Sequence, residues 1–329
     1  MKLVQFESGT GPHLGALLPS GWLLDLVTLR QKLPEAAALP LRIEELLAPE
    51  SLSNTAELVR KVAADDRFCQ ELKEFQILRH HEGVRLLPPV LQPRLILSSG
   101  GAYRDHLKEM SVQGSQLPAG FIKCAASVTG PSDPIVLPRN ASEMVDWEGE
   151  FACVIGKTCH QVTVDEAMDY VAGYTLINDV SARDWVKPFL AANGAPMEVA
   201  HRALDNIMGK QYPTFCPIGP CIVTKDELTD PGKLTITTRV NGEVMQHADT
   251  ADLIFSLAQT ISHFSRWYQF LPGDIITTGT PSGVGYAHVP PRFLRPGDVV
   301  EVHVEEIGAL RNPVVAASTA SADLAKAPK

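Results

Sequence analysis

Three carboxylates lie at the ends of apolar segments, where they could bind a metal ion. Glu148 and Glu150 begin the apolar run 151–155, and Asp179 follows the apolar run 173–178. If the first run is a strand, Glu148 and Glu150 point to the same face and repel each other, unless a cation, a shared proton or solvent relieves them. A solvated strand end is the more frequent explanation of Glu-x-Glu alone. Asp179 favours a metal, because a carboxylate on a buried strand is costly without a partner.

Oxygen ligands without a nearby His or Cys favour a hard cation, namely Mg²⁺, Mn²⁺ or Ca²⁺. Mg²⁺ usually keeps coordination positions for water and substrate. A small 2-oxo acid could then bind through its carboxylate and keto oxygens, and the metal would polarise the keto group. The three carboxylates therefore predict metal-dependent chemistry on a 2-oxo acid.

A histidine and a glutamate could supply a base. His106 and Glu109 are three residues apart, so they would be neighbours on a helix. A carboxylate that holds an imidazole fixes its tautomer and raises its basicity, which makes the pair a natural general base. From the spacing alone, a surface helix with incidental charges is the more frequent explanation.

A glycine-rich segment, Gly-Thr-Pro-Ser-Gly-Val-Gly at 279–285, follows the strand-like run 274–278. Such a loop can bring backbone N–H groups close to an anion. It is not a Walker A motif, because the Gly-Lys-Ser/Thr ending is missing. A tight turn explains the pattern equally well.

Short strand-like segments dominate the chain after residue 88. They cover 94–98, 147–155, 172–178, 220–224, 234–240, 273–278 and 298–304. Asn241-Gly242 predicts a type I′ hairpin. A helix is predicted to start at the capping box Thr163-x-x-Glu166, and another to run through about 250–268. This mixture predicts a strand-rich α+β fold rather than a regular βαβ repeat.

The first 88 residues have a different character. Residues 14–18 and 22–26 flank Pro-Ser-Gly and predict a hairpin. Residues 42–78 have helical periodicity, with possible N-caps at 53–55. A Pro-rich stretch at 87–93 suits a boundary, so we predict domains at 1–88 and 89–329, with a tail that is frayed from about 314.

Composition excludes several classes of protein. The 329-residue chain has a formal net charge of −9, which disfavours nucleic-acid binding. It has no apolar run of the roughly 18 residues that a membrane span needs, and no signal-peptide pattern at its start. The six cysteines lack CxxC spacing, which favours reduced thiols and a cytoplasmic protein.

The chain resembles the fumarylacetoacetate hydrolase family from about residue 94 to 313. The likeness rests on segments that occur in the family's order: Tyr103-x-x-His106-x-x-Glu109, Phe121-Ile122-Lys123, Trp147-Glu148-Gly149-Glu150, Gly173 to Asp184, Gly209-Lys210, Thr214 to Pro220, and Leu271 through Gly285. The resemblance implies a mixed β-sandwich roll with a smaller N-terminal domain, and usually a homodimer.

The resemblance also implies roles for particular residues. Glu148, Glu150 and Asp179 match the ligands of Mg²⁺ or Mn²⁺. His106 and Glu109 match the dyad that activates water, on a segment that often forms a lid. Lys123 matches a lysine that polarises the substrate or stabilises an enolate, and the remaining matches line the substrate site: Tyr103, Arg183, Lys210 and Thr280.

Two departures concern the pocket mouth. Many members have Gln three residues after the Arg of Ser-Ala-Arg-Asp, where this chain has Val186. Residues 187–208 form a longer stretch than in the small acylpyruvate hydrolases. Both put the distal half of the substrate in doubt, and Val186 predicts that fumarylacetoacetate itself is a poor substrate.

These features predict hydrolytic C–C cleavage of a 2,4-dioxo acid, with water activated by His106 and an enolate leaving group stabilised by the metal and Lys123. One alternative is an isomerase, decarboxylase or dehydratase that acts on a related 2-oxo acid. A second alternative is a metal-dependent binding protein without catalysis. The intact His-x-x-Glu favours hydrolysis, because an isomerase needs no activated water.

Overall fold

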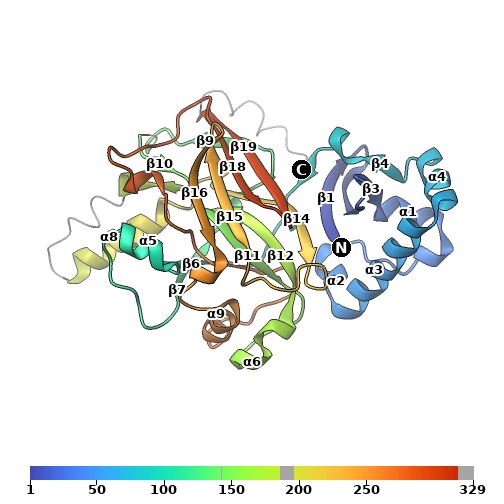
Figure 1. The fold of residues 1–329 in the computed structure, drawn as a ribbon, viewed down its shortest axis with the longest axis horizontal. Helices are drawn as coiled ribbons and strands as arrows, with labels where there is room; N and C mark the ends of the chain where they lie inside the picture. Colours follow the sequence, from blue (N-terminus) through green and yellow to red (C-terminus); the bar gives the residue numbers. More distant parts are fainter. Residues whose placement is uncertain (142, 186–195, 318–329) are drawn as a thin grey trace.

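The computed structural model describes residues 1–141, 143–185 and 196–317 (Figure 1). Among these residues, one mixed sheet contains twelve strands. Ten of them follow one another across the sheet in this order: β4 (Leu78–His80), β3 (Trp22–Asp25), β2 (Gly11–Leu17), β1 (Lys2–Ser8), β14 (Cys216–Thr224), β12 (Val171–Asn178), β11 (Gly149–Ile155), β17 (Ile275–Thr277), β6 (Ile96–Gly100) and β7 (Ala119–Lys123). Strands β5 (Leu86–Leu87) and β8 (Val128–Thr129) pair with β1 and β14 at the side of this path.

A second sheet of five strands packs against the first. Its order is β16 (Glu243–Asp249), β15 (Thr235–Val240), β18 (Val299–Val304), β19 (Gly308–Ala316) and β9 (Ile135–Leu137). Phe151 of β11 lies in one buried cluster with Ile236 of β15 and Val302 of β18. A two-stranded sheet of β10 (Val145–Asp146) and β13 (Ser181–Ala182) lies beside them. The predicted strand-rich α+β class is confirmed.

Strand β11 is buried on both faces, which explains its continuous apolar sequence. Phe151 and Cys153 face the second sheet, whereas Ala152 and Val154 belong to the cluster that contains Leu46 and Leu47 of the N-terminal helices. The central strand is therefore held from both sides, and the carboxylates at its first residues have a rigid support.

Helices cover the outer faces of the sheets. The N-terminal ones are α1 (Leu26–Lys32), α2 (Ile43–Leu46), α3 (Pro49–Ala64) and α4 (Asp66–Glu74). The later ones are α5 (Arg104–Glu109), α6 (Val164–Ala167), α8 (Pro196–Met208) and α9 (Leu257–Phe264). Within the described residues, no helix is long and apolar enough to cross a membrane.

Local signals in the sequence predicted several of these elements. The Thr163–Glu166 capping box starts α6, and Asn241-Gly242 turns between β15 and β16 with φ values of 53° and 84°. The N-caps predicted at 53–55 are wrong, because α3 already begins at Pro49 after Ala48. The helix predicted over 250–268 is shorter, since α9 begins only after a capping box of Ser256 and Gln259.

The first sheet continues across the predicted boundary near residue 88. Strand β1 pairs with β14, with Leu3 opposite Ile222. Figure 1 shows the N-terminal strands and α1–α4, in blue, beside the larger body of the chain. The predicted β2–β3 hairpin is present, with Ala16 opposite Leu24. The division into 1–88 and 89–329 stays a prediction.

The chain is still in a strand at residue 314, where the tail was predicted to begin. Residues 314–316 are the end of β19, where Val314 pairs with Ile135 and its side chain is buried. Val314 packs into a buried cluster with Ile135 and Val300, and β19 continues to Ala316, so the chain is ordered past residue 314. The remainder of the predicted tail, 318–329, lies outside the described residues.

Candidate active site

Antiparallel pairing brings the three predicted metal ligands together. Strands β11 and β12 pair with Gly149 opposite Asn178, so the residues just beyond them, Glu148 and Asp179, are neighbours. Asp179 N donates a 2.9 Å hydrogen bond to Glu148 O. One carboxylate oxygen from each of Glu148, Glu150 and Asp179 lies within 4.8 Å of the others. The spacing argument therefore located a real cluster.

The cluster fits a divalent cation. All three side chains are buried, and Glu150 Oε2 has no hydrogen-bond partner. Burial and the neighbouring carboxylates of Asp179 and Glu148 raise the pKa of Glu150 well above its ordinary value. A buried carboxylate oxygen without a donor is costly, and a cation bound by these hard oxygen ligands would remove that cost.

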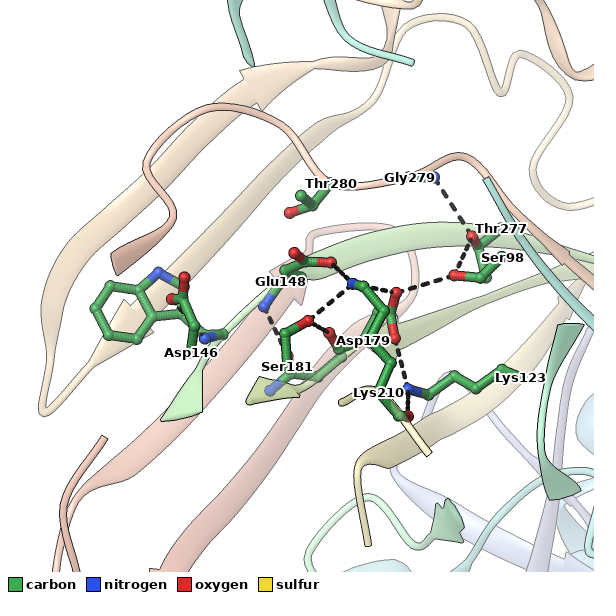
Figure 2. Close-up of polar contacts among 12 residues, drawn as sticks. Ser98, Lys123, Asp146, Glu148, Asp179, Ser181, Lys210, Thr277, Gly279 and Thr280 are labelled. Atoms are coloured by element: carbon green, nitrogen blue, oxygen red, sulfur yellow. Dashed lines mark hydrogen bonds and ion pairs between the residues drawn. The ribbon is translucent and has the colours of Figure 1, made fainter. Parts of the chain in front are cut away.

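Two buried lysines contact the same carboxylates (Figure 2). Lys123 Nζ donates to Asp179 Oδ1 at 2.5 Å and to the carbonyl of Lys210 at 2.6 Å. Lys210 Nζ donates to Glu148 Oε2 at 2.6 Å, to Asp179 Oδ2 at 2.9 Å and to Ser181 Oγ at 2.8 Å. Asp179 and Glu148 thus keep their charge because an ammonium group lies beside each of them.

The pKa values follow from these contacts. Burial alone would raise the pKa of Asp179, but the Lys123 and Lys210 ammonium groups lower it below its ordinary value. Burial likewise opposes ionisation of Glu148, and Lys210 and Arg183 lower its pKa. Two of the three carboxylates are therefore ionised at neutral pH and ready to bind a cation.

Arg183 holds Glu148 from the other side. Its Nε donates to Asp146 Oδ2 at 2.9 Å, and its Nη2 donates to Glu148 Oε1 at 2.5 Å. The β10–β13 pair places Asp146 opposite Ser181, two residues before Arg183, which explains this approach. The predicted substrate-binding arginine is thus already engaged by two carboxylates.

The glycine-rich loop uses its backbone N–H groups on the protein's own carboxylates. Gly283 N donates to Glu109 Oε1 at 2.9 Å, and Gly285 N donates to Asp146 Oδ1 at 2.7 Å. Thr280 Oγ1 donates to the carbonyl of Gly149 at 3.2 Å, beside the metal ligands. The loop is therefore a fixed wall of the site.

Glycine at position 283 is required by the packing of this loop. Gly283 has a φ of +97°, and a Cβ there would lie 1.9 Å from the carbonyl oxygen of Met245. Gly242 has a φ of +84° but nothing within 4 Å. Gly242→Ala should therefore cost only the positive-φ penalty of about 1–2 kcal/mol. Gly283→Ala should cost clearly more, as urea unfolding would measure, and equal losses would contradict this tight packing.

The His106–Glu109 pair forms as predicted on α5. His106 Nδ1 lies 3.1 Å from Glu109 Oε2, and the two side chains are 14% and 22% exposed. Because Glu109 also accepts from Gly283 N, the pair is tied to the glycine-rich loop rather than free on a surface helix. Within the described residues, no hydrogen bond joins the pair directly to the three carboxylates.

Tyr103 lies at the start of α5 and is fully buried. Its hydroxyl is 3.4 Å from Thr278 Oγ1, next to the glycine-rich loop. Burial raises the pKa of Tyr103, so the phenol keeps its proton. Val186 and residues 187–195, to which the two sequence departures were assigned, lie outside the described residues, and residues 196–208 form α8.

The sequence interpretation missed three residues that hold this site together. Asp146 binds Arg183 and the loop, Gln246 binds Gly149 and Thr280, and Ser98 Oγ donates to Asp179 Oδ2 at 3.1 Å. Asp146 directly precedes the Trp-Glu-Gly-Glu motif, which could have drawn attention to it. Gln246 and Ser98 are far away in sequence and lie in segments without any recognisable motif.

Comparisons with known proteins show the family of this chain. The model of the fumarylacetoacetate hydrolase C-terminal family matches residues 95–315. The chain is 38% identical to the mitochondrial oxaloacetate tautomerase fahd2 of Xenopus laevis over 317 residues, which covers 96% of this chain and 90% of that protein. A solved fumarylacetoacetate hydrolase from Exiguobacterium antarcticum is 33% identical, with a TM-score of 0.73 over 96% of this chain and 99% of that one.

A further solved relative carries a metal. Maleylpyruvate hydrolase from Sphingobium sp. SYK-6, in complex with manganese(II) and pyruvate, is 28% identical, with a TM-score of 0.71 over 96% of this chain and 99% of that one. The chain therefore belongs to the fumarylacetoacetate hydrolase family, has its fold and is an enzyme of that family. Because its relatives include tautomerases and hydrolases, membership alone does not establish C–C cleavage. The predicted homodimer and cytoplasmic location stay predictions.

Proposed function

We propose that the enzyme catalyses keto–enol tautomerisation of a small 2-oxo acid, with oxaloacetate as the first candidate. The observation that carries this proposal is the pair of buried ammonium groups of Lys123 and Lys210 on Asp179, beside the other two carboxylates. Such a cluster stabilises negative charge on a 2-oxo acid. The oxaloacetate tautomerase at 38% identity over nearly the whole chain supports the choice of reaction.

Glu148, Glu150 and Asp179 would hold a divalent cation, Mg²⁺ or Mn²⁺ for preference. When bound, the cation acts as a Lewis acid that polarises the 2-oxo group. Loss of a proton from C3 leaves negative charge on the 2-oxo oxygen, and the buried ammonium groups stabilise that charge. In this proposal Lys123 Nζ, which donates to Asp179 Oδ1, passes a proton to the 2-oxo oxygen, and the amine so formed takes the proton from C3, so that the enol forms and the ammonium group is restored.

The other matched residues have positioning roles in this proposal. Arg183 fixes the orientation of Glu148, and Thr280 lies on the wall formed by the glycine-rich loop. Tyr103 stays neutral and supports Thr278 of the same segment. These contacts hold the carboxylates and the loop in fixed positions, so that the charges of the site are preorganised for the reacting acid.

Hydrolytic cleavage of a 2,4-dioxo acid is the second candidate, and a specific observation favours it. His106 and Glu109 form a dyad that can activate a water molecule, whereas tautomerisation consumes no water. In the part of the chain that the structure describes, the dyad is bonded to the glycine-rich loop rather than to the three carboxylates. It would therefore take part only in a reaction that consumes water. Fumarylacetoacetate is still expected to be a poor substrate because of Val186.

One pair of assays separates the two candidates. The purified enzyme, loaded with Mg²⁺ or Mn²⁺, would be tested for enolisation of oxaloacetate and for cleavage of a panel of acylpyruvates. We expect metal-dependent tautomerisation that EDTA abolishes, with a higher kcat/KM than for any cleavage reaction. Efficient cleavage without tautomerisation would reverse the order of the candidates. No turnover with metal bound would leave only the binding protein.

A further inference from the structure

The side chain of Gln246 links the second sheet to the metal-ligand segment and to the glycine-rich loop. It is 1% exposed, on β16 of the second sheet. Its Oε1 accepts a 2.9 Å hydrogen bond from Gly149 N, and its Nε2 donates to Thr280 Oγ1 at 2.8 Å and to Pro281 O at 2.9 Å. One amide therefore contacts both the metal-ligand segment and the glycine-rich loop.

These contacts close a ring of hydrogen bonds. Gly149 N donates to Gln246, Gln246 donates to Thr280, and Thr280 Oγ1 donates back to the carbonyl of Gly149. Every donor in the ring has an acceptor, and each residue both gives and receives. Only a primary amide offers an acceptor and a donor at this separation, because a carboxylate accepts but cannot donate.

The ring fixes the residue between two metal ligands. Gly149 separates Glu148 from Glu150, so a rotation of its peptide groups would move both carboxylates. The second sheet packs closely against Gly149, because a Cβ added there would lie 2.1 Å from Thr238 Oγ1. Thr238 is paired with Gln246 across β15 and β16. Gln246 and Thr238, two neighbouring residues of the second sheet, therefore both contact the metal-ligand segment at Gly149.

We infer that Gln246 is a positioning residue that sets the geometry of Glu148 and Glu150 relative to Thr280. It touches no reacting atom, and it acts through the peptide of Gly149 and through the loop. The inference rests on the proposed function, because it assumes a metal held by the three carboxylates and an acid bound against Thr280. If the inference holds, both the metal affinity and the position of the glycine-rich loop depend on the side-chain amide of Gln246.

The test measures Mn²⁺ binding and turnover in the full chain. Gln246→Ala should raise the Mn²⁺ dissociation constant by about 10–100-fold, the usual effect of removing a partner of a metal ligand. Titration calorimetry without substrate measures this constant. For oxaloacetate at saturating Mn²⁺, kcat should fall more than KM rises, because the charges that bind the acid remain in place.

Asn312→Ala is the matched control. Asn312 lies on β19 of the same sheet, is 1% exposed, and donates through Nδ2 to the carbonyls of Gly130 and Asp133 at 3.0 and 2.8 Å. Its loss removes two comparable buried hydrogen bonds away from the site. It should lower the melting temperature while leaving the Mn²⁺ dissociation constant and kcat unchanged. A Gln246→Ala variant that behaves in the same way would overturn the inference.

A double-mutant cycle tests the ring itself. Thr280→Val removes the hydroxyl that closes the ring, so it should also weaken Mn²⁺ binding. The Mn²⁺ dissociation constant of the Gln246→Ala/Thr280→Val double variant should be hardly higher than that of either single variant. Thr280→Ser keeps the hydroxyl and should restore binding. Independent, additive effects would contradict the ring.

If Gln246→Ala does not fold, the Mn²⁺ affinities of Thr280→Val and Thr280→Ser decide the question. If the wild type binds Mn²⁺ without converting oxaloacetate, the proposed function fails while the binding data still decide this inference.

Discussion

Asp179→Asn should abolish divalent-metal binding and, with it, both tautomerisation and any cleavage activity. The Asp179 carboxylate receives Lys123 on one oxygen and both Lys210 and Ser98 on the other. The amide keeps the shape but removes the charge that a cation requires. It also leaves the buried Lys123 ammonium without its counter-ion, and breaking one side of a buried ion pair costs about 3–5 kcal/mol.

The loss of stability must be separated from the loss of the metal site. Asp274→Asn is a suitable control, because Asp274 is equally buried and bonds Arg94 and two backbone N–H groups away from the carboxylate cluster. Both variants should unfold at lower temperature, but only Asp179→Asn should lose Mn²⁺ in titration calorimetry. A folded Asp179→Asn enzyme with wild-type Mn²⁺ affinity would show that the ligands lie elsewhere.

His106→Ala should distinguish the two candidate reactions. If His106 is the general base for water, its removal should lower kcat for C–C cleavage by about 10²–10⁴. KM should change less, since the charges that hold the acid are still present. Tautomerisation of oxaloacetate should survive, because Lys123 and Lys210 are untouched. The measurement is a pair of assays on one variant, with its metal content checked.

Two further variants make this experiment specific. Lys108→Ala removes an exposed charge from the same helix, where the Lys108 ammonium group bonds Asp105, and should leave both reactions unchanged. Glu109→Gln keeps an acceptor for Gly283 N while removing the charge beside His106, so it should slow cleavage mildly without releasing the loop. Near-normal cleavage by metal-loaded His106→Ala would mean that the dyad is not the base.

The sequence predicted those parts of the site that depend on local geometry. Residues 148 and 150 share a face because strand side chains alternate, and α5 brings His106 to Glu109 because residues three apart are neighbours on a helix. The capping box at Thr163 and the Asn241-Gly242 turn are equally local. Such features depend on only a few consecutive residues, so they can be predicted from one sequence.

The parts that were missed depend on contacts between distant segments. Gln246 reaches Gly149 across 97 residues, and nothing in the sequence of β16 marks its glutamine as buried. The ion pairs of Arg183 with Asp146 and Glu148 were not predicted, because they depend on the short β10–β13 pair, and the substrate-binding role of Arg183 stays a prediction. The early start of α3 was hidden because Thr55 bonds back to the carbonyl of Ser51 within the helix instead of capping it.

The pairing of β1 with β14 has a consequence for anyone who would express the family-matched region alone. A chain trimmed to residues 95–315 would lose β1, whose Val4 and Phe6 share a buried cluster with Val223 of β14. The end of β14 around Ile222 and Val223 would then be an open sheet edge with bare apolar side chains. Such edges recruit other chains, so the trimmed protein should aggregate before it could be assayed. We therefore expect the N-terminal strands to keep the catalytic sheet soluble by covering the edge of β14.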